Sequence, residues 1–89
     1  MPPKFDTGQT CMTRGVESSI PMPEILEALR RHVSGDWGNV CDEDAAQNEW
    51  SLANDARVLA AYEAENGTVF WIITEANRAA TTVLLPEEY

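Results

Sequence analysis

Positive charge is scarce in this sequence of 89 residues. Six lysines and arginines stand against fifteen aspartates and glutamates, which gives a formal net charge of −9. A protein that binds nucleic acid neutralises phosphates with lysine and arginine, so the shortage argues against direct nucleic-acid binding. The same shortage argues against docking on an anionic membrane surface, which also needs clustered basic residues.

Histidine and cysteine are equally scarce, with one histidine, His32, and two cysteines, Cys11 and Cys41. A zinc site needs several such ligands at suitable spacing, and the sequence does not offer them. It also lacks a glycine-rich phosphate loop, a Ser-His-Asp set and a Cys-x-x-Cys motif. We therefore predict that the protein is not an enzyme and uses no metal or cofactor. We expect His32 to be a cation at a helix C-terminus and the cysteines to be buried free thiols, with a His–Cys nucleophile pair as the disfavoured alternative.

Long hydrophobic runs are also missing. The longest, Val69 to Ile73, is far shorter than the ~20 residues that span a bilayer, and the N-terminus has no apolar segment typical of a signal peptide. These features predict a cytoplasmic protein that does not contact the membrane. Apolar residues still make up 44% of the chain, which is enough for a core. We expect a flexible lead-in over residues 1–8 and one compact domain over residues 9–89.

Two helices are predicted in the middle of the chain. Residues 23–34 begin with Pro-Glu, place apolar residues at helical spacing and end with basic residues, which suits the helix dipole. Gly35 follows as the expected C-terminal glycine. A second helix over residues 42–53 is expected to use Asp42 as its N-cap, with further acids favourable in the first turn.

Four strands are predicted around these helices, at residues 9–13, 58–63, 68–74 and 81–85. Asn66-Gly67 favours a hairpin with a type I′ turn between the second and third strands. The third strand is the most apolar and is expected at the centre of the sheet, with either Phe70 and Ile72 or Trp71 and Ile73 facing the helices. The fold class that follows is α+β, an antiparallel sheet of three to four strands with two helices packed on one face.

Two groups of residues are expected to have structural roles. The aromatic side chains, Trp37 and Trp50 among them, are expected mostly in the core because the domain is small. Glu75 and Arg78 stand three residues apart in a tight loop, and we expect them to form a local salt bridge.

Acidic residues are concentrated in one stretch, residues 33–56, which contains no lysine or arginine. The spacing does not match an EF-hand loop, since Ala46 and Gln47 occupy the fifth and sixth positions of that pattern. Favourable charge at a helix N-terminus explains part of the stretch, but six acids without counter-charge exceed what capping needs. We predict that six residues face a partner: Asp36, Asp42, Glu43, Asp44, Glu49 and Asp55.

Several segments together resemble a family of small acidic bacterial proteins. They are Met-Thr-Arg-Gly-Val at 12–16, His-Val-Ser-Gly-Asp-Trp-Gly at 32–38, Trp-Ile-Ile-Thr-Glu-Ala-Asn-Arg at 71–78 and Thr-Thr-Val-Leu-Leu-Pro-Glu-Glu-Tyr at 81–89. The resemblance covers most of the chain from Thr10 to Tyr89, with Asn77 where the family is expected to have aspartate. Members are carried on plasmids, integrative elements and prophage-like regions, so the resemblance implies a mobile-element protein but names no chemistry.

Small acidic proteins of mobile elements are similar in profile to anti-CRISPR and anti-restriction proteins, several of which mimic DNA. By this analogy we predict an inhibitor of a bacterial CRISPR-Cas effector, type I-like, whose acidic surface occupies a basic DNA-binding surface of the complex and blocks target DNA. The alternative is a small non-catalytic interaction module of a plasmid or integrative element, without DNA mimicry. The strong net charge predicts a monomer, although an exposed strand edge could pair two copies.

Overall fold

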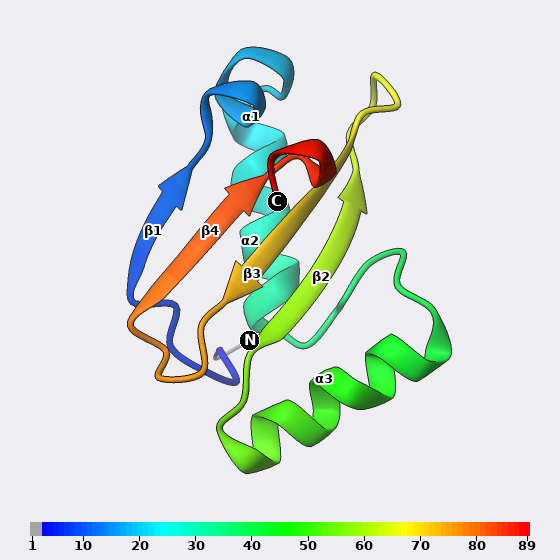
Figure 1. Ribbon diagram of the computed structural model, residues 1–89. Coiled ribbons are helices and arrows are strands. Elements are labelled where there is room, and N and C mark those ends of the chain that lie inside the picture. Colours follow the sequence, from blue (N-terminus) through cyan, green and yellow to red (C-terminus); the bar gives the residue numbers. More distant parts are fainter. Residues whose placement is uncertain (1–2) are drawn as a thin grey trace.

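The computed structural model of the protein describes residues 3–89. The chain forms one four-stranded sheet with helices behind it and at its ends (Figure 1). The elements in chain order are β1 (Gln9–Met12), α1 (Arg14–Ser19), α2 (Met22–Val33), α3 (Asp42–Asn54), β2 (Val58–Glu63), β3 (Val69–Thr74), β4 (Ala80–Leu84) and a final 3₁₀ turn, η1 (Pro86–Glu88). The α+β class is confirmed, and each predicted helix and strand has a counterpart within one or two residues of its expected bounds.

The strand order across the sheet is β1-β4-β3-β2, and the last three strands of the chain form an antiparallel meander. β1 instead pairs with β4 in parallel, with Thr10 beside Thr81 and Met12 beside Val83. The prediction of a purely antiparallel sheet is therefore wrong, and the sheet is mixed. The helix α2 runs back behind the sheet, so the chain can re-enter the sheet at β2 in the same direction as β1 (Figure 1). β2, β3 and β4 then alternate in direction, and β4 therefore runs parallel to β1.

The core lies between the sheet and α2. Phe70 and Ile72 of β3 point into it and are almost completely buried, so the prediction that β3 is central and that this pair faces a helix is confirmed. Trp71, on the opposite face, is half-buried. Ile73 lies on that face too but is only 4% exposed, since Leu59 and Thr82 flank it in the register.

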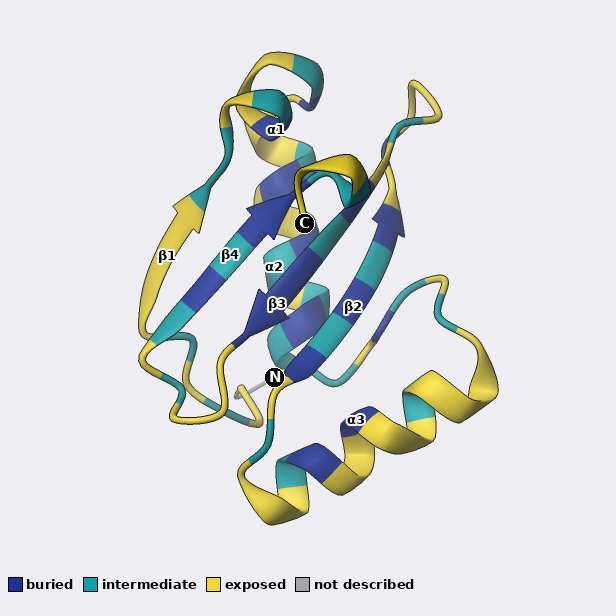
Figure 2. Ribbon diagram, viewed as in Figure 1, coloured by how far each residue is buried: buried dark blue, intermediate teal, exposed yellow. Residues whose placement is uncertain are grey.

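The two predicted helices are placed differently. α2 lies behind the sheet and buries Ile25, Ala28 and His32. α3 lies beside the beginning of β2 and is exposed along most of its length (Figure 2). The packing of two helices on one face is therefore not confirmed. The short α1 was not predicted; Thr13 caps it by accepting a hydrogen bond from the Val16 amide at 3.4 Å.

The predicted hairpin between β2 and β3 is confirmed, but its turn is not type I′. Gly67 has a positive φ of 86°, whereas Asn66 does not. The Gly67 amide donates to the Ala64 carbonyl and the Ala64 amide donates to the Thr68 carbonyl, both at 2.9 Å. This is a three-residue loop closed by a glycine in the left-handed region. Such loops are the most common hairpin connections after the two-residue type I′ and II′ turns.

The edge of β2 is covered by the segment before α3. The Asn39 amide donates to the Ala61 carbonyl at 2.7 Å, and the Ala61 amide donates to the Trp37 carbonyl at 3.1 Å. Gly38 sits between them with φ of 73°, and a Cβ there would lie 2.0 Å from the Ala61 oxygen. Only glycine fits this approach, so the sequence around residue 38 fixes how the loop reaches the sheet.

Part of the predicted lead-in contacts the domain. The Lys4 amide donates to the Val33 carbonyl at 2.7 Å, and Phe5 is half-buried against the rings of His32 and Trp37. Met1 and Pro2 lie outside the described residues. Within residues 3–89, no helix is both long enough and apolar enough to cross a bilayer.

Candidate functional site

Two of the six predicted acidic residues, Asp36 and Glu49, are exposed but also form hydrogen bonds within the fold. Asp36 pairs with Arg31, with Nε–Oδ2 and Nη2–Oδ1 distances of 2.7 and 3.2 Å, and also accepts from the Gly38 amide. The hydrogen bond from Arg31 is the main reason that the pKa of the Asp36 carboxyl lies below its usual range. Glu49 accepts a hydrogen bond at 2.8 Å from the indole nitrogen of the buried Trp37. These two carboxylates hold the loop before α3 in place.

The other four acids are also exposed and lie at the two ends of α3. Asp42, Glu43 and Asp44 form its first turn, where their charge suits the helix dipole. The N-cap is Cys41, so the prediction that Asp42 caps the helix is wrong by one residue. Asp55 ends the helix in the left-handed conformation, with φ of 53°. At 1.5 Å per residue it lies about 20 Å along the helix axis from Asp42, so Asp55 belongs to a separate surface.

α3 is attached to the sheet by one buried amide. Asn48 is 4% exposed and uses both ends of its side chain on the backbone of Leu59, an edge residue of β2. Its Nδ2 donates to the Leu59 carbonyl at 2.8 Å, and its Oδ1 accepts from the Leu59 amide at 3.1 Å. The amide thus takes the place of a neighbouring strand at this edge.

The end of α3 is held by Arg78, from the loop between β3 and β4. Its guanidinium donates to the carbonyls of Ser51 at 3.1 Å, Ala56 at 2.6 Å and Glu75 at 3.2 Å. The predicted salt bridge with the Glu75 carboxylate is therefore wrong. The guanidinium donors are instead directed to backbone carbonyls of α3, of the segment after it and of the loop of Arg78 itself.

The outer face of α3 presents an aromatic residue. Trp50 is 55% exposed, so its predicted place in the core is wrong. Glu43, Ala46 and Gln47 precede it at helical spacing and line a shallow hollow beside the indole. The signal was available in the sequence, because the residues three and four positions before Trp50 are polar or small.

His32 is fully buried, and the prediction of a cation at a helix C-terminus is wrong. Desolvation, with a smaller contribution from the nearby Arg78, lowers the pKa of His32 to about 4. Its Nε2 lies 2.9 Å from Thr74 Oγ1, and its ring makes edge contacts with those of Phe5 and Trp37. The imidazole is therefore neutral at pH 7.

A chain of hydrogen bonds fixes the tautomer of His32. Thr81 donates its single hydroxyl proton to the carbonyl of Thr7 at 2.8 Å, so at its 2.8 Å contact with Thr74 it must accept. Thr74 has then used its own proton and must accept from His32 Nε2–H. This leaves Nδ1 as an acceptor, which is buried and has no hydrogen-bond partner among residues 3–89. The network is a structural element of the core.

The cysteines lie on the surface rather than in the core. Cys11 and Cys41 are free thiols, as predicted, but both are exposed, so the expectation of burial is wrong. Within residues 3–89, the acids, cysteines and histidine form no group of three that could hold a metal ion.

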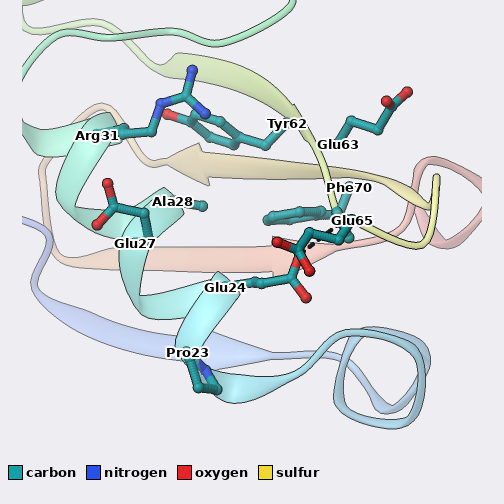
Figure 3. Close-up of a pocket in the computed structure, with 10 residues that line it drawn as sticks. Pro23, Glu24, Glu27, Ala28, Arg31, Tyr62, Glu63, Glu65 and Phe70 are labelled. Carbon is teal, nitrogen blue, oxygen red and sulfur yellow. Dashed lines mark hydrogen bonds between the residues drawn. The ribbon is translucent and has the colours of Figure 1, made fainter.

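A second acidic feature is a groove between α2 and the β2–β3 hairpin (Figure 3). Glu24 and Glu65 lie beside each other at one end, Phe70 and Ala28 form its floor, and Tyr62 with the guanidinium of Arg31 stacked on its ring closes the other end. Its volume of about 260 Å³ is below the ~300–1,000 Å³ of small-molecule sites, so it suits at most a side chain. The sequence could not indicate this groove, because its walls come from segments almost forty residues apart.

The chain matches no protein-family model, no curated protein and no solved structure.

Proposed function

We propose that the protein is a non-catalytic inhibitor from a mobile element that binds a basic DNA-binding surface of a partner complex and excludes DNA from it. A CRISPR effector is the partner class that the analogy with anti-CRISPR proteins favours. The observation that supports this proposal is the first turn of α3, where Asp42, Glu43 and Asp44 are exposed on a helix that projects from the sheet. The stretch around it, residues 33–56, has no lysine or arginine to neutralise them.

Physical chemistry connects this helix with a DNA-binding groove. Duplex DNA has one negative charge per ~1.7 Å of its axis, and proteins that bind it present lysine and arginine along a groove. Acids on an exposed helix present fixed negative charge to the same groove, and complementary potentials raise the rate of association. Asp36 and Glu49 contribute indirectly, since their internal hydrogen bonds position the helix.

Charge reversal in the first turn of α3 tests the proposal. We expect Asp42→Lys with Asp44→Lys to weaken partner binding by roughly 10- to 100-fold, because attraction to a basic surface becomes repulsion. A single Asp42→Ala change should be nearly silent, since one exposed pair contributes only about 0.2–1 kcal/mol. Affinity of the wild type should fall as salt rises, through screening over a Debye length of ~8–10 Å. Binding to purified type I CRISPR effector complexes at two salt concentrations measures both effects.

The matched control is Glu75→Lys with Glu87→Lys, which makes the same charge change at exposed positions outside α3. It should lower affinity by no more than a few-fold. Thermal unfolding of all variants checks that the lost dipole complementarity in α3, about 0.3–1 kcal/mol per residue, has not unfolded the helix. Equal losses in the two double variants would contradict a specific role for α3.

A second candidate, an interaction module without DNA mimicry, is supported by Trp50. An exposed indole adds nothing to a mimic of the phosphate backbone, but it suits a protein interface. A DNA-competition assay separates the two functions. Loss of target-DNA binding by the saturated complex supports the inhibitor, and unchanged DNA binding supports the module.

A further inference from the structure

One of the three tryptophans, Trp50, lies largely at the surface. Trp37 is 6% exposed and belongs to the core, and Trp71 packs against the ring of Tyr89 with centroids 5.7 Å apart. Trp50 is 55% exposed on the outer face of α3. Tryptophan is the residue type most enriched among interface hot spots, where its large ring enters a pocket of the partner.

We propose that α3 docks by this outer face on a partner protein, with Trp50 inserted in an apolar pocket whose rim is basic. The inference rests on the proposed function, because it describes the partner of the same acidic helix. Ala46 is small and leaves one side of the indole open, where the hollow lies. Gln47 and Glu43 border the hollow and can bind polar groups at the rim of the pocket.

The negative charge of this face indicates which class of molecule can bind to it. A second copy of the chain carries the same formal net charge of −9 and the same acidic helix, and like charges oppose such a contact. Nucleic acid and anionic lipid are excluded from the face for the same reason. A basic protein surface complements the acids, and an apolar pocket in it complements the indole.

The face is rigid before it binds. Asn48 joins the middle of α3 to Leu59, and Arg78 joins its end to the loop after β3. A side chain held on such a helix loses little freedom on binding, so more of its contact energy appears as affinity. The arrangement differs from a flexible acidic tail, which offers charge without a fixed apolar anchor.

Two synthetic peptides of equal length and equal lysine content test the inference, one with leucines between the lysines and one with serines. We expect the leucine peptide to bind the wild-type protein at least about tenfold more tightly, because only it offers an apolar contact to the indole. In Trp50→Ala this preference should disappear. With 5-fluorotryptophan incorporated, the ¹⁹F signal of Trp50, assigned with Trp50→Phe, should shift most of the three.

Leu26→Ala is the matched control, because Leu26 is an exposed apolar residue of α2, 58% exposed, outside the docking face. It should retain the preference for leucine. A wild-type protein that does not prefer the leucine peptide, or a preference that survives Trp50→Ala, overturns the inference even if DNA competition is observed. A second outcome separates the inference from the proposed function. The preference for leucine could depend on Trp50 while Asp42→Lys with Asp44→Lys leaves the binding of both peptides and DNA competition unchanged. The proposed function then fails and the Trp50 contact stands.

Discussion

Acidification from pH 6.5 to pH 4 is expected to lower the free energy of unfolding by about 3 kcal/mol through His32 alone. The pKa of His32 falls from 6.5 to about 4 in the folded protein, mainly by desolvation. Above pH 6.5 the imidazole is neutral in both the folded and unfolded states, and its contribution to stability is fully present. As the pH falls below 6.5, the unfolded state binds the proton first, so stability is lost until the folded pKa is reached.

The buried network shows why protonation is unfavourable. Nδ1 would become a donor in a site where no acceptor lies within reach among the described residues, and Nε2–H is already committed to Thr74. The guanidinium of Arg78 is close enough to add to the cost. Protonated His32 would thus be an unpaired buried charge, one of the costliest defects in a core.

Unfolding by urea at a series of pH values measures the effect. His32→Gln should be less stable at pH 7, by about 1–2 kcal/mol, because one buried hydrogen bond is altered. The stability advantage of wild type over His32→Gln should then shrink and reverse between pH 6.5 and pH 4, since wild type loses about 3 kcal/mol through His32 and glutamine does not titrate. His32→Leu serves as a second variant if His32→Gln does not fold. The comparison cancels the carboxylates, which titrate in both proteins, and parallel pH profiles would show that His32 is not the titrating group.

Asn48→Asp is expected to destabilise the protein by about 3 kcal/mol at pH 7. The two side chains have the same shape, but a carboxylate oxygen would replace Nδ2, the group that donates to the Leu59 carbonyl at 2.8 Å. Two acceptors would then face each other at a site where Asn48 is only 4% exposed. The buried negative charge adds to the penalty.

Gln47→Glu is the control for this change. It makes the same exchange of amide for carboxylate on the same helix, but at an exposed position, and it should alter stability by less than about 0.5 kcal/mol. Hydrogen exchange at the Leu59 amide gives a local measurement, since repulsion at the Leu59 carbonyl should detach α3 and expose that amide only in Asn48→Asp. Equal stability of the two variants would show that the Asn48 amide does not attach α3 to the sheet.

Local pattern was enough to predict most elements. α2 follows from apolar residues at helical spacing between Pro23 and the basic last turn, and α3 from its run of acids and alanines. β2 and β3 follow from alternation around Asn66-Gly67. These signals are strong because helix and hairpin contacts join residues that are near one another in sequence. The short α1 was missed because six residues give too little periodicity, although Thr13 is a suitable N-cap.

Long-range pairing decided the rest of the fold. β1 reaches β4 across about seventy residues, and its own sequence does not state whether the pair is parallel. The position of α3 depends on Asn48 meeting Leu59 and on Arg78 meeting the helix C-terminus. Neither contact could be deduced from spacing, since each joins a side chain to a backbone group from another element.

Composition and local order are enough to establish the sign and concentration of charge, the α+β class, and the apolar strand at the centre of the sheet. Which acids form hydrogen bonds within the fold depends on contacts between different elements. The tertiary structure committed Asp36 to Arg31 and Glu49 to the indole of Trp37, and it left the first turn of α3 exposed. It also buried His32 and exposed Trp50, opposite to what residue type suggests. The physical reason is that the environment of a side chain is set by neighbours that are distant in sequence.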